Sequence, residues 1–161
     1  MTPHPAAADQ TAVEVDSLDF CYGSKQSLFN VTMKVPRNRV TAFIGPSGCG
    51  KSTLLSIIAG LLAPETGTIV VNNPDGSLHY PRVGYMLQHD HLFEWRTIYQ
   101  NVTLGLEIHH ALTKERTDYV KQLLSDYGLE SFQDKRPSEL SGGMKQRAAL
   151  IRTLALDPQL L

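Results

Sequence analysis

The stretch GPSGCGKS at residues 45–52 constrains the fold more than any other part of this chain. It matches the phosphate-loop pattern G-x-x-x-x-G-K-[ST] at every required position. An apolar run at 40–44 precedes it, and a helical pattern at 51–62 follows it. Strand, loop and helix in this order predict an α/β protein with a P-loop NTPase (RecA-like) core. The alternative, a glycine-rich turn with a chance lysine, would not require this setting.

The residue types of the loop suit a nucleoside triphosphate. Glycines let the backbone bend so that successive N–H groups converge on one anion, and the following helix adds the positive end of its dipole. Lys51 brings a full charge to the β- and γ-phosphates, and Ser52 offers a hydroxyl to Mg²⁺. Cys49 is interpreted as a small filler rather than a reactive thiol. The predicted nucleotide-binding residues of the loop are Gly45, Pro46, Ser47, Gly48, Cys49, Gly50, Lys51, Ser52 and Thr53.

Alternation of apolar residues predicts half-buried antiparallel strands at 13–22 and 29–35. The first strand carries a one-residue slip at Asp16–Ser17. Another strand is predicted at 67–73, with a turn at 72–76. The apolar residues expected on one face of the second strand are Phe29, Val31, Met33 and Val35.

Two other runs, 40–44 and 83–87, are apolar almost throughout, which is typical of strands covered on both faces in a parallel sheet. Residues 159–161 look like the opening of one more buried strand. Helical spacing and capping residues, among them Gly128 after the third helix, complete the pattern. Helices are predicted at 51–62, 97–110 and 113–127, and from an N-cap at Ser141 to a stop at Asp157–Pro158.

Composition excludes several classes of protein. The net charge is −1 and the pI is near 6.6, so no basic face for nucleic acid is expected. No apolar stretch approaches the roughly 18 residues that span a bilayer, and residues 1–11 are interpreted as a disordered polar tail without a secretion signal. Two cysteines suit a reducing compartment. Four histidines are interpreted as surface residues rather than metal ligands: His89, His91, His109 and His110.

A second helix start with phosphate-binding character lies in LSGGMKQR at 140–147. With it the chain, from about Val13 to its last residue, resembles the ATP-binding cassette family, the nucleotide-driven subunits of ABC transporters. The resemblance consists of Tyr22 ahead of the phosphate loop, the loop itself, Gln88 after an apolar run, and the S-G-G signature. One departure is Met144, where the family most often has glutamine.

The resemblance implies ATP and Mg²⁺ as ligands and a homodimer of two cassettes packed head to tail. Lys51 and Gln88 would be the catalytic residues of this chain, with Ser52 and Gln88 on Mg²⁺, and Tyr22 would stack on adenine. The signature residues that would bind the partner's ATP are Ser141, Gly142 and Gly143. Three alternatives stay open: a core tyrosine at 22, a solvated loop glutamine at 88, and an ordinary capped helix start at 141.

Residues 87–108 resemble importers of the nitrate, sulfonate and taurine group. The expected partners are transmembrane permease subunits and, indirectly, an extracytoplasmic solute-binding protein, at the cytoplasmic face of the cell membrane. Phe93, Trp95 and Ile98 are the expected docking residues, although Trp95 could instead belong to the core of the helical subdomain. A soluble ABC-type ATPase of translation or repair, or an inactive ATP-binding fragment, are the alternative functions.

The resemblance also implies a domain organisation. We expect an ATP-binding domain at 12–161, with a core at 12–88 that includes an antiparallel β subdomain, an inserted helical subdomain at 89–147, and a return to the core at 148–161. The metal aspartate, the catalytic glutamate and the switch histidine of the family are not present, so a fragment that folds poorly alone and does not hydrolyse ATP is expected. The residues expected to lose neighbours with the central strands are Phe43, Ile44, Val83 and Tyr85.

Overall fold

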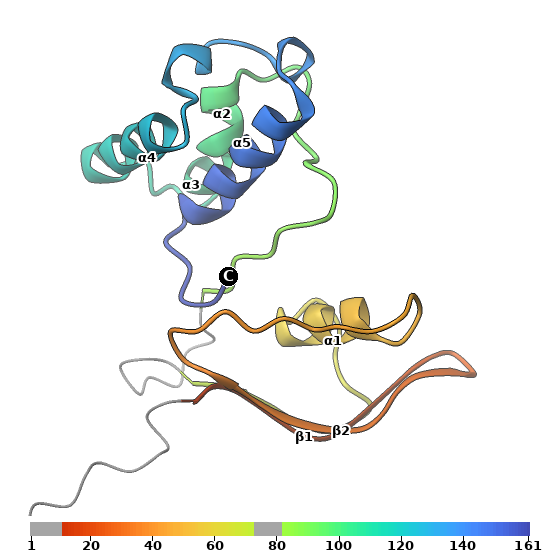
Figure 1. Ribbon diagram of the computed structural model, residues 1–161. Helices are drawn as coiled ribbons and strands as arrows, with labels where there is room; N and C mark the ends of the chain where they lie inside the picture. Colours follow the sequence, from red (N-terminus) through yellow and green to blue (C-terminus); the bar gives the residue numbers. More distant parts are fainter. Residues whose placement is uncertain (1–10, 73–81) are drawn as a thin grey trace, which may run out of the picture. The chain divides into compact units, whose positions relative to one another are not determined.

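The computed structural model describes residues 11–72 and 82–161, and it divides into two units, residues 1–81 and 82–161. The first unit holds a sheet and the phosphate loop, and the second holds most of the helices (Figure 1). The tail predicted at 1–11 and the turn predicted at 72–76 lie mostly outside the described residues. Among the helices of the described ranges, none has both the length and the apolar character to cross a membrane.

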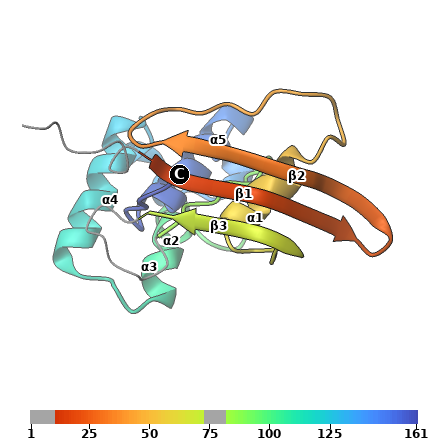
Figure 2. The same ribbon diagram turned by 90° about the horizontal axis from the view of Figure 1, so that it is seen from below.

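The sheet of the first unit has three antiparallel strands in the order β2-β1-β3 (Figure 2). They are β1 (Thr11–Tyr22), β2 (Lys25–Pro36) and β3 (Thr66–Val71). This confirms the antiparallel strands predicted at 13–22 and 29–35, and also the strand predicted at 67–73. Thr11 already belongs to β1, so the predicted tail extends one residue too far.

The slip predicted at Asp16–Ser17 is a β-bulge. The register between β1 and β2 shifts between Val15 and Leu18, and Ser17 has a φ of 50°. Its N–H donates to Thr32 Oγ1 at 2.9 Å. Gly67, with a φ of 83°, packs so closely here that a Cβ would lie 2.5 Å from the Ser17 carbonyl oxygen. Only glycine allows this approach.

A second bulge corrects the predicted face of β2. Phe29 and Asn30 lie opposite the single residue Asp19 of β1, and Asn30 has a φ of 44°. Because a one-residue shift moves side chains to the other face, Leu28 is buried and Phe29 is exposed. The prediction that Phe29 shares the apolar face was therefore wrong.

Helix α1 (Lys51–Ile58) lies on one face of the sheet and buries Leu54, Ile57 and Ile58 (Figures 1 and 2). It is shorter than the predicted helix at 51–62. Gly60 has a φ of 73°, its N–H donates to the Ile57 carbonyl at 3.0 Å, and the Leu61 N–H donates to the Ser56 carbonyl at 2.9 Å. These two bonds form a Schellman motif, which ends the helix at a glycine.

The predicted strand at 40–44 is not formed, and Ile44 is 94% exposed. The run predicted at 83–87 makes only a single parallel bridge, from Val83 to Leu160. There the Gly84 N–H donates to the Leu160 carbonyl at 2.7 Å, so residues 159–161 do begin to pair as a strand. A strand bonds to neighbours rather than to itself, and the described ranges hold no such neighbours for 40–44. Of the residues expected to lose neighbours, Ile44 is exposed and the other three are partly buried.

The second unit is a helical bundle around a core of leucine, isoleucine, valine and alanine side chains. The predicted helix at 97–110 is split at Thr103, whose hydroxyl donates to the Tyr99 carbonyl at 2.8 Å, a contact that bends helices. The elements are α2 (Ile98–Val102), α3 (Leu104–Ile108), α4 (Lys114–Asp126), the 3-10 turns Glu130–Phe132 and Pro137–Glu139, and α5 (Gly142–Leu154).

Two predicted caps are confirmed in this unit. Gly128 has a φ of 68° and its N–H donates to the Ser125 carbonyl at 3.0 Å, which ends α4. Ser141 is the N-cap of α5. That helix continues past residue 147, and Ala148, Ala149 and Ile151 are buried in the helical core. Residues 148–154 therefore belong to the helical unit rather than to a return to the sheet.

The carboxylate of Asp19 connects the three strands and predicts an acid-sensitive contribution to stability. It accepts from the Asn30 N–H and the Thr66 hydroxyl, both at 2.8 Å, and these bonds lower the pKa of Asp19. The stabilisation is full above the unfolded-state pKa of about 4 and is lost as the pH falls through the lower folded-state pKa. We expect Asp19→Asn to reduce stability at pH 7 and to weaken its loss on acidification.

Urea unfolding at pH 7 and pH 3, followed by circular dichroism, measures this effect. Asp118→Asn, which alters an exposed carboxylate of α4, is the control. An equal drop between the two pH values in parent and Asp19→Asn would contradict the assignment.

Candidate nucleotide-binding site

The phosphate loop is shaped by two glycines with left-handed backbone and by the strand beneath it. Gly48 has a φ of 81° and Gly50 a φ of 93°. A Cβ on Gly50 would lie 2.6 Å from Leu28 Cδ2 and 2.8 Å from the Ser27 carbonyl oxygen. The Ser27 and Thr53 hydroxyls are hydrogen-bonded at 3.1 Å. Strand β2 therefore packs directly against the turn that leads into α1.

Lys51 lies folded over the loop that precedes it. Its Nζ donates to the carbonyl oxygens of Gly45 and Pro46 at 2.8 and 2.7 Å, and it lies 3.4 Å from Cys49 Sγ. By helix geometry, the N–H groups of the first turn of α1 have no acceptor inside the helix. The first helical bond is donated by the Leu54 N–H to the Gly50 carbonyl at 2.9 Å. A charged ammonium and N–H groups without an acceptor inside the helix thus gather at one helix start, which suits an anion.

A pocket of about 590 Å³ joins the phosphate loop to the first β-hairpin. Tyr22 lines it, 54% exposed, with its ring edge-on to Phe20 at a centroid distance of 4.9 Å. The alternative that Tyr22 is a core residue is therefore wrong. The residues that line the pocket are Tyr22, Lys25, Gln26, Ser27, Ser47, Gly48, Gly50, Lys51, Ser52 and Thr53.

Three of these lining residues, Lys25, Gln26 and Ser27, were missed from the sequence. They begin β2 directly after the hairpin turn at Gly23, which has a φ of 60°. Gly23 directly follows the alternating run that ends at Tyr22, and this is a signal from which a hairpin could have been predicted. The hairpin brings the start of β2 past the phosphate loop. This placement depends on tertiary contacts, which the local sequence pattern does not show.

Cys49 lies exposed in the loop. Its Sγ would be 2.9 Å from a Cβ built on Gly45. The thiol thus occupies the space beside Gly45. A larger side chain at position 45 or 49 would need the same space. This packing supports the interpretation of Cys49 as a small filler.

The predicted signature residues form an open helix end in the second unit. The Ser141 hydroxyl accepts from the Met144 N–H at 3.4 Å and caps α5. Gly142 and Gly143 are exposed, and a Cβ on either would meet nothing within 4 Å. Neither is among the residues with positive φ. Glycine lowers helix stability by about 1 kcal/mol relative to alanine. No contact in the described part of the chain explains why two glycines stand at this helix start.

Side chains of α5 hold the backbone of the segment that contains Gln88. The Gln146 amide donates to the Gln88 carbonyl at 3.3 Å. The Arg152 guanidinium donates to the Asp90 and His91 carbonyls at 2.7 and 2.8 Å, and its burial lowers the pKa of Arg152. Gln88 is exposed and, with the signature, belongs to the helical unit. Its predicted Mg²⁺ contact stays a prediction.

The histidines at 89, 91, 109 and 110 are all exposed, as expected for surface residues. In the ranges that the structure describes, no group of three or more histidine, cysteine, aspartate or glutamate side chains is placed to hold a metal ion.

The expected docking residues separate into one buried and two accessible side chains. Ile98 is 0% exposed and belongs to the helical core, so its assignment to the docking face was wrong. Trp95 is 71% exposed, which also excludes the alternative that it belongs to that core. The Phe93 ring packs against it at a centroid distance of 4.8 Å.

Together, the phosphate loop, the hairpin pocket and the open end of α5 define a nucleotide-binding protein with a phosphate-loop α/β core. A protein-family model described as ABC transporter matches residues 28–161. The chain therefore belongs to the ABC transporter family.

Two proteins similar to this chain are named as ATP-binding proteins of transport systems. It is 52% identical over 120 residues to the uncharacterized ABC transporter ATP-binding protein YtlC of Bacillus subtilis, covering 74% of this chain and 46% of that protein. It is 43% identical over 143 residues to the sulfate/thiosulfate import ATP-binding protein CysA of Nocardia farcinica, covering 87% of this chain and 43% of that protein. The chain thus spans less than half the length of these relatives.

Solved structures confirm the predicted fold class. The structure of cbiO1 from Clostridium perfringens, described as part of the ABC transporter complex cbiONQ, matches with a TM-score of 0.78 at 29% identity. The match covers 92% of this chain and 63% of cbiO1. An ATP-binding subunit of an ABC transporter matches with a TM-score of 0.77 at 28% identity. The antiparallel sheet and the helices of this chain are part of that P-loop NTPase fold.

The close contact at Gly50 generates a prediction about the loop. Alanine at position 48 or 50 would adopt a left-handed conformation, which costs about 1–2 kcal/mol. Only at position 50 would the new Cβ also collide with Leu28 and the Ser27 carbonyl. We expect Gly50→Ala to lower the melting temperature clearly more than the matched control Gly48→Ala. The measurement is thermal unfolding without nucleotide, and equal shifts would show that β2 does not brace the loop.

Proposed function

We propose that this chain is the ATP-binding region of a subunit that hydrolyses ATP to energise an ABC importer of small solutes. The observation that carries the proposal is the pocket that joins Tyr22 to the phosphate loop, in a chain of the ABC transporter family. The solute class that we propose is an oxyanion of the nitrate, sulfonate or taurine type. The name of the Nocardia relative, which specifies sulfate and thiosulfate import, supports this chemistry because sulfate is also an oxyanion.

The residues of the pocket fit Mg²⁺-ATP. Tyr22 offers an accessible ring for stacking on adenine. The loop N–H groups and Lys51 would bind the phosphates, with the Lys51 ammonium exchanging the Gly45 and Pro46 carbonyls for phosphate oxygens. The exposed Ser52 hydroxyl would hold Mg²⁺. The family resemblance, rather than the lining of this pocket, implies that Gln88 would do so as well. When bound, Mg²⁺ neutralises charge that develops on the transferred phosphoryl group.

The signature would act on the nucleotide of a second copy of the subunit. The Ser141 side chain caps the N-terminus of α5 but leaves it accessible. Gly142 and Gly143 leave room for a ligand to approach the backbone. Anions bind favourably at such a helix start. Two subunits would enclose two ATP molecules head to tail, and because the ligand lies in the interface, ATP would drive dimerisation.

The accessible pair Phe93 and Trp95 is the proposed docking surface for a transmembrane permease subunit. A solute-binding protein outside the cell would deliver the oxyanion to that permease, and this subunit would work at the cytoplasmic face of the membrane. Support comes from the 71% exposure of Trp95, because large exposed aromatic residues are enriched in protein interfaces.

Gly143→Ala tests the sandwich of two subunits. A Cβ at this position meets nothing within 4 Å in the chain, and alanine favours a helix, so folding and ATP binding by the monomer should persist. Dimerisation with a non-hydrolysable ATP analogue should weaken by tenfold or more, about 1.4 kcal/mol. Light scattering after size-exclusion chromatography measures it. A variant that dimerises like the parent would contradict the proposed role of the signature.

Trp95→Ala tests the docking surface. Ile108→Ala is the matched control, because Ile108 is an apolar side chain of the same unit that is 64% exposed. We expect the tryptophan variant to bind ATP normally but to recover much less of its permease subunit in a detergent pull-down. The isoleucine variant should assemble like the parent, and equal assembly of all three proteins would contradict docking through Trp95.

A further inference from the structure

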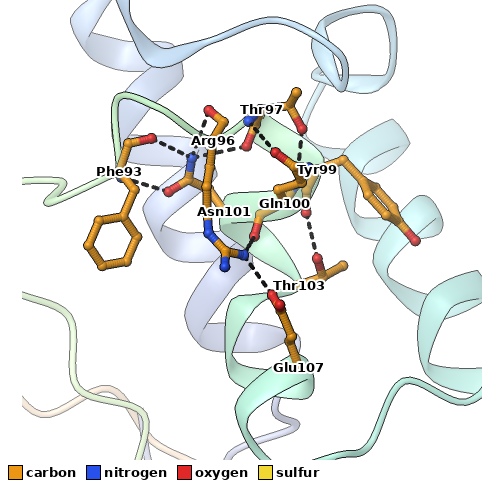
Figure 3. Close-up of polar contacts among 8 residues, drawn as sticks. All are labelled: Phe93, Arg96, Thr97, Tyr99, Gln100, Asn101, Thr103 and Glu107. Carbon is orange, nitrogen blue, oxygen red and sulfur yellow. Dashed lines mark hydrogen bonds and ion pairs between the residues drawn. The ribbon is translucent and has the colours of Figure 1, made fainter.

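The turn that carries Trp95 is held by a single buried side chain. Asn101 of α2 is 0% exposed. Its amide oxygen accepts from the Phe93 N–H at 2.7 Å, and its amide nitrogen donates to the carbonyls of Phe93, Arg96 and Thr97 at 3.1, 3.3 and 2.9 Å. Figure 3 shows this amide between the two ends of the turn.

All these bonds go to the main chain of one short segment. The Arg96 N–H donates to the Phe93 carbonyl at 3.1 Å, so residues 93–96 form a tight turn with Trp95 near its tip. Asn101 grips both the first residue of the turn and the residues that follow its tip. An apolar side chain would fill the same space in the helical core, but it would leave the main-chain groups that Asn101 binds without this partner.

Other polar contacts involve the residues on either side of Trp95. Thr97 and Gln100 form a capping box at the start of α2, and Arg96 pairs with Glu107 at 2.6 Å (Figure 3). Glu94 pairs with Lys145 at 3.8 Å. Because both charges beside Trp95 have partners within the chain, the tip presents mainly the aromatic rings of Phe93 and Trp95.

We propose that Asn101 is a positioning residue, which orders the Phe93–Arg96 turn in advance so that Trp95 meets an apolar segment of the membrane partner in one orientation. The inference rests on the proposed docking role of Trp95. A partner that binds a turn already ordered loses less conformational entropy on binding. Asn101 itself, being buried, would not touch the partner.

A double-mutant cycle on this protein tests the proposal, with its permease subunit purified in detergent as the probe. Asn101→Ala and Trp95→Ala should each weaken assembly by about tenfold, and the double variant should be no weaker than Trp95→Ala alone. Coupling of this kind is expected if Asn101 acts through Trp95. If the two losses multiply, Asn101 acts on stability alone and the proposal is overturned.

A second measurement separates this inference from the docking proposal. Trp95 is the only tryptophan of the chain, so its fluorescence anisotropy reports the turn directly. Asn101→Ala should lower that anisotropy and speed hydrogen exchange at the Phe93 amide, while ATP binding and the melting temperature of the sheet unit stay unchanged. If these signals change but Trp95→Ala assembles normally, the docking proposal fails. Unchanged anisotropy and exchange would overturn the positioning role.

Asn101→Asp separates the acceptor of this side chain from its donors. It keeps the size of the side chain and the acceptor for the Phe93 N–H, but it removes the donors to the carbonyls of Phe93, Arg96 and Thr97. The positioning role predicts lower anisotropy for this variant also, whereas parent-like anisotropy would overturn the role of those three bonds.

Discussion

Strand β2 packs against the phosphate loop at Gly50, and the nucleotide pocket depends on this contact. The left-handed backbone of Gly50 lets the chain turn into α1 while its Cα lies against Ser27 and Leu28. The same packing brings the first residues of β2 and the ring of Tyr22 to the loop. A bulge of β2 at Phe29–Asn30 turns Leu28 inward, so the irregularity of the strand serves the site.

In the helical unit, a few polar side chains hold the main chain of the 88–96 segment. Arg152 and Gln146 of α5 hold the carbonyls of residues 88, 90 and 91, and Asn101 of α2 holds the turn at 93–96. The segment that follows Gln88 is therefore bonded to the same helix that begins at the signature.

Prediction from the sequence succeeded best where an element satisfies its own hydrogen bonds. Helices α1, α4 and α5 form where spacing and caps indicated, because their main-chain bonds are local. The end of α1 was missed because Gly60 was interpreted as a helical residue rather than as a Schellman glycine. The run at 40–44 has the composition of a strand but is not one here, since a strand needs hydrogen-bonding neighbours from elsewhere in the chain.

The candidate site divides in the same way. The phosphate loop and Tyr22 could be identified from residue types and spacing, whereas Lys25, Gln26 and Ser27 could not, because only the folded hairpin brings them to the loop. Trp95 and Ile98 are both apolar and three residues apart. Their exposure differs because Ile98 lies in α2 and packs into the helical core, whereas Trp95 lies in the turn before that helix.

Residue types and their spacing were enough to locate the phosphate loop, the order of strand and helix patterns, and the capped helix start at Ser141. These features depend on a few consecutive residues, whose backbone preferences and charges act locally. The folded chain was needed to see which face of β2 is buried, which side chains line the pocket, and that Asn101 holds the turn of Trp95. Those outcomes depend on contacts between residues distant in the chain, where close packing selects among arrangements that local preferences leave equally favourable.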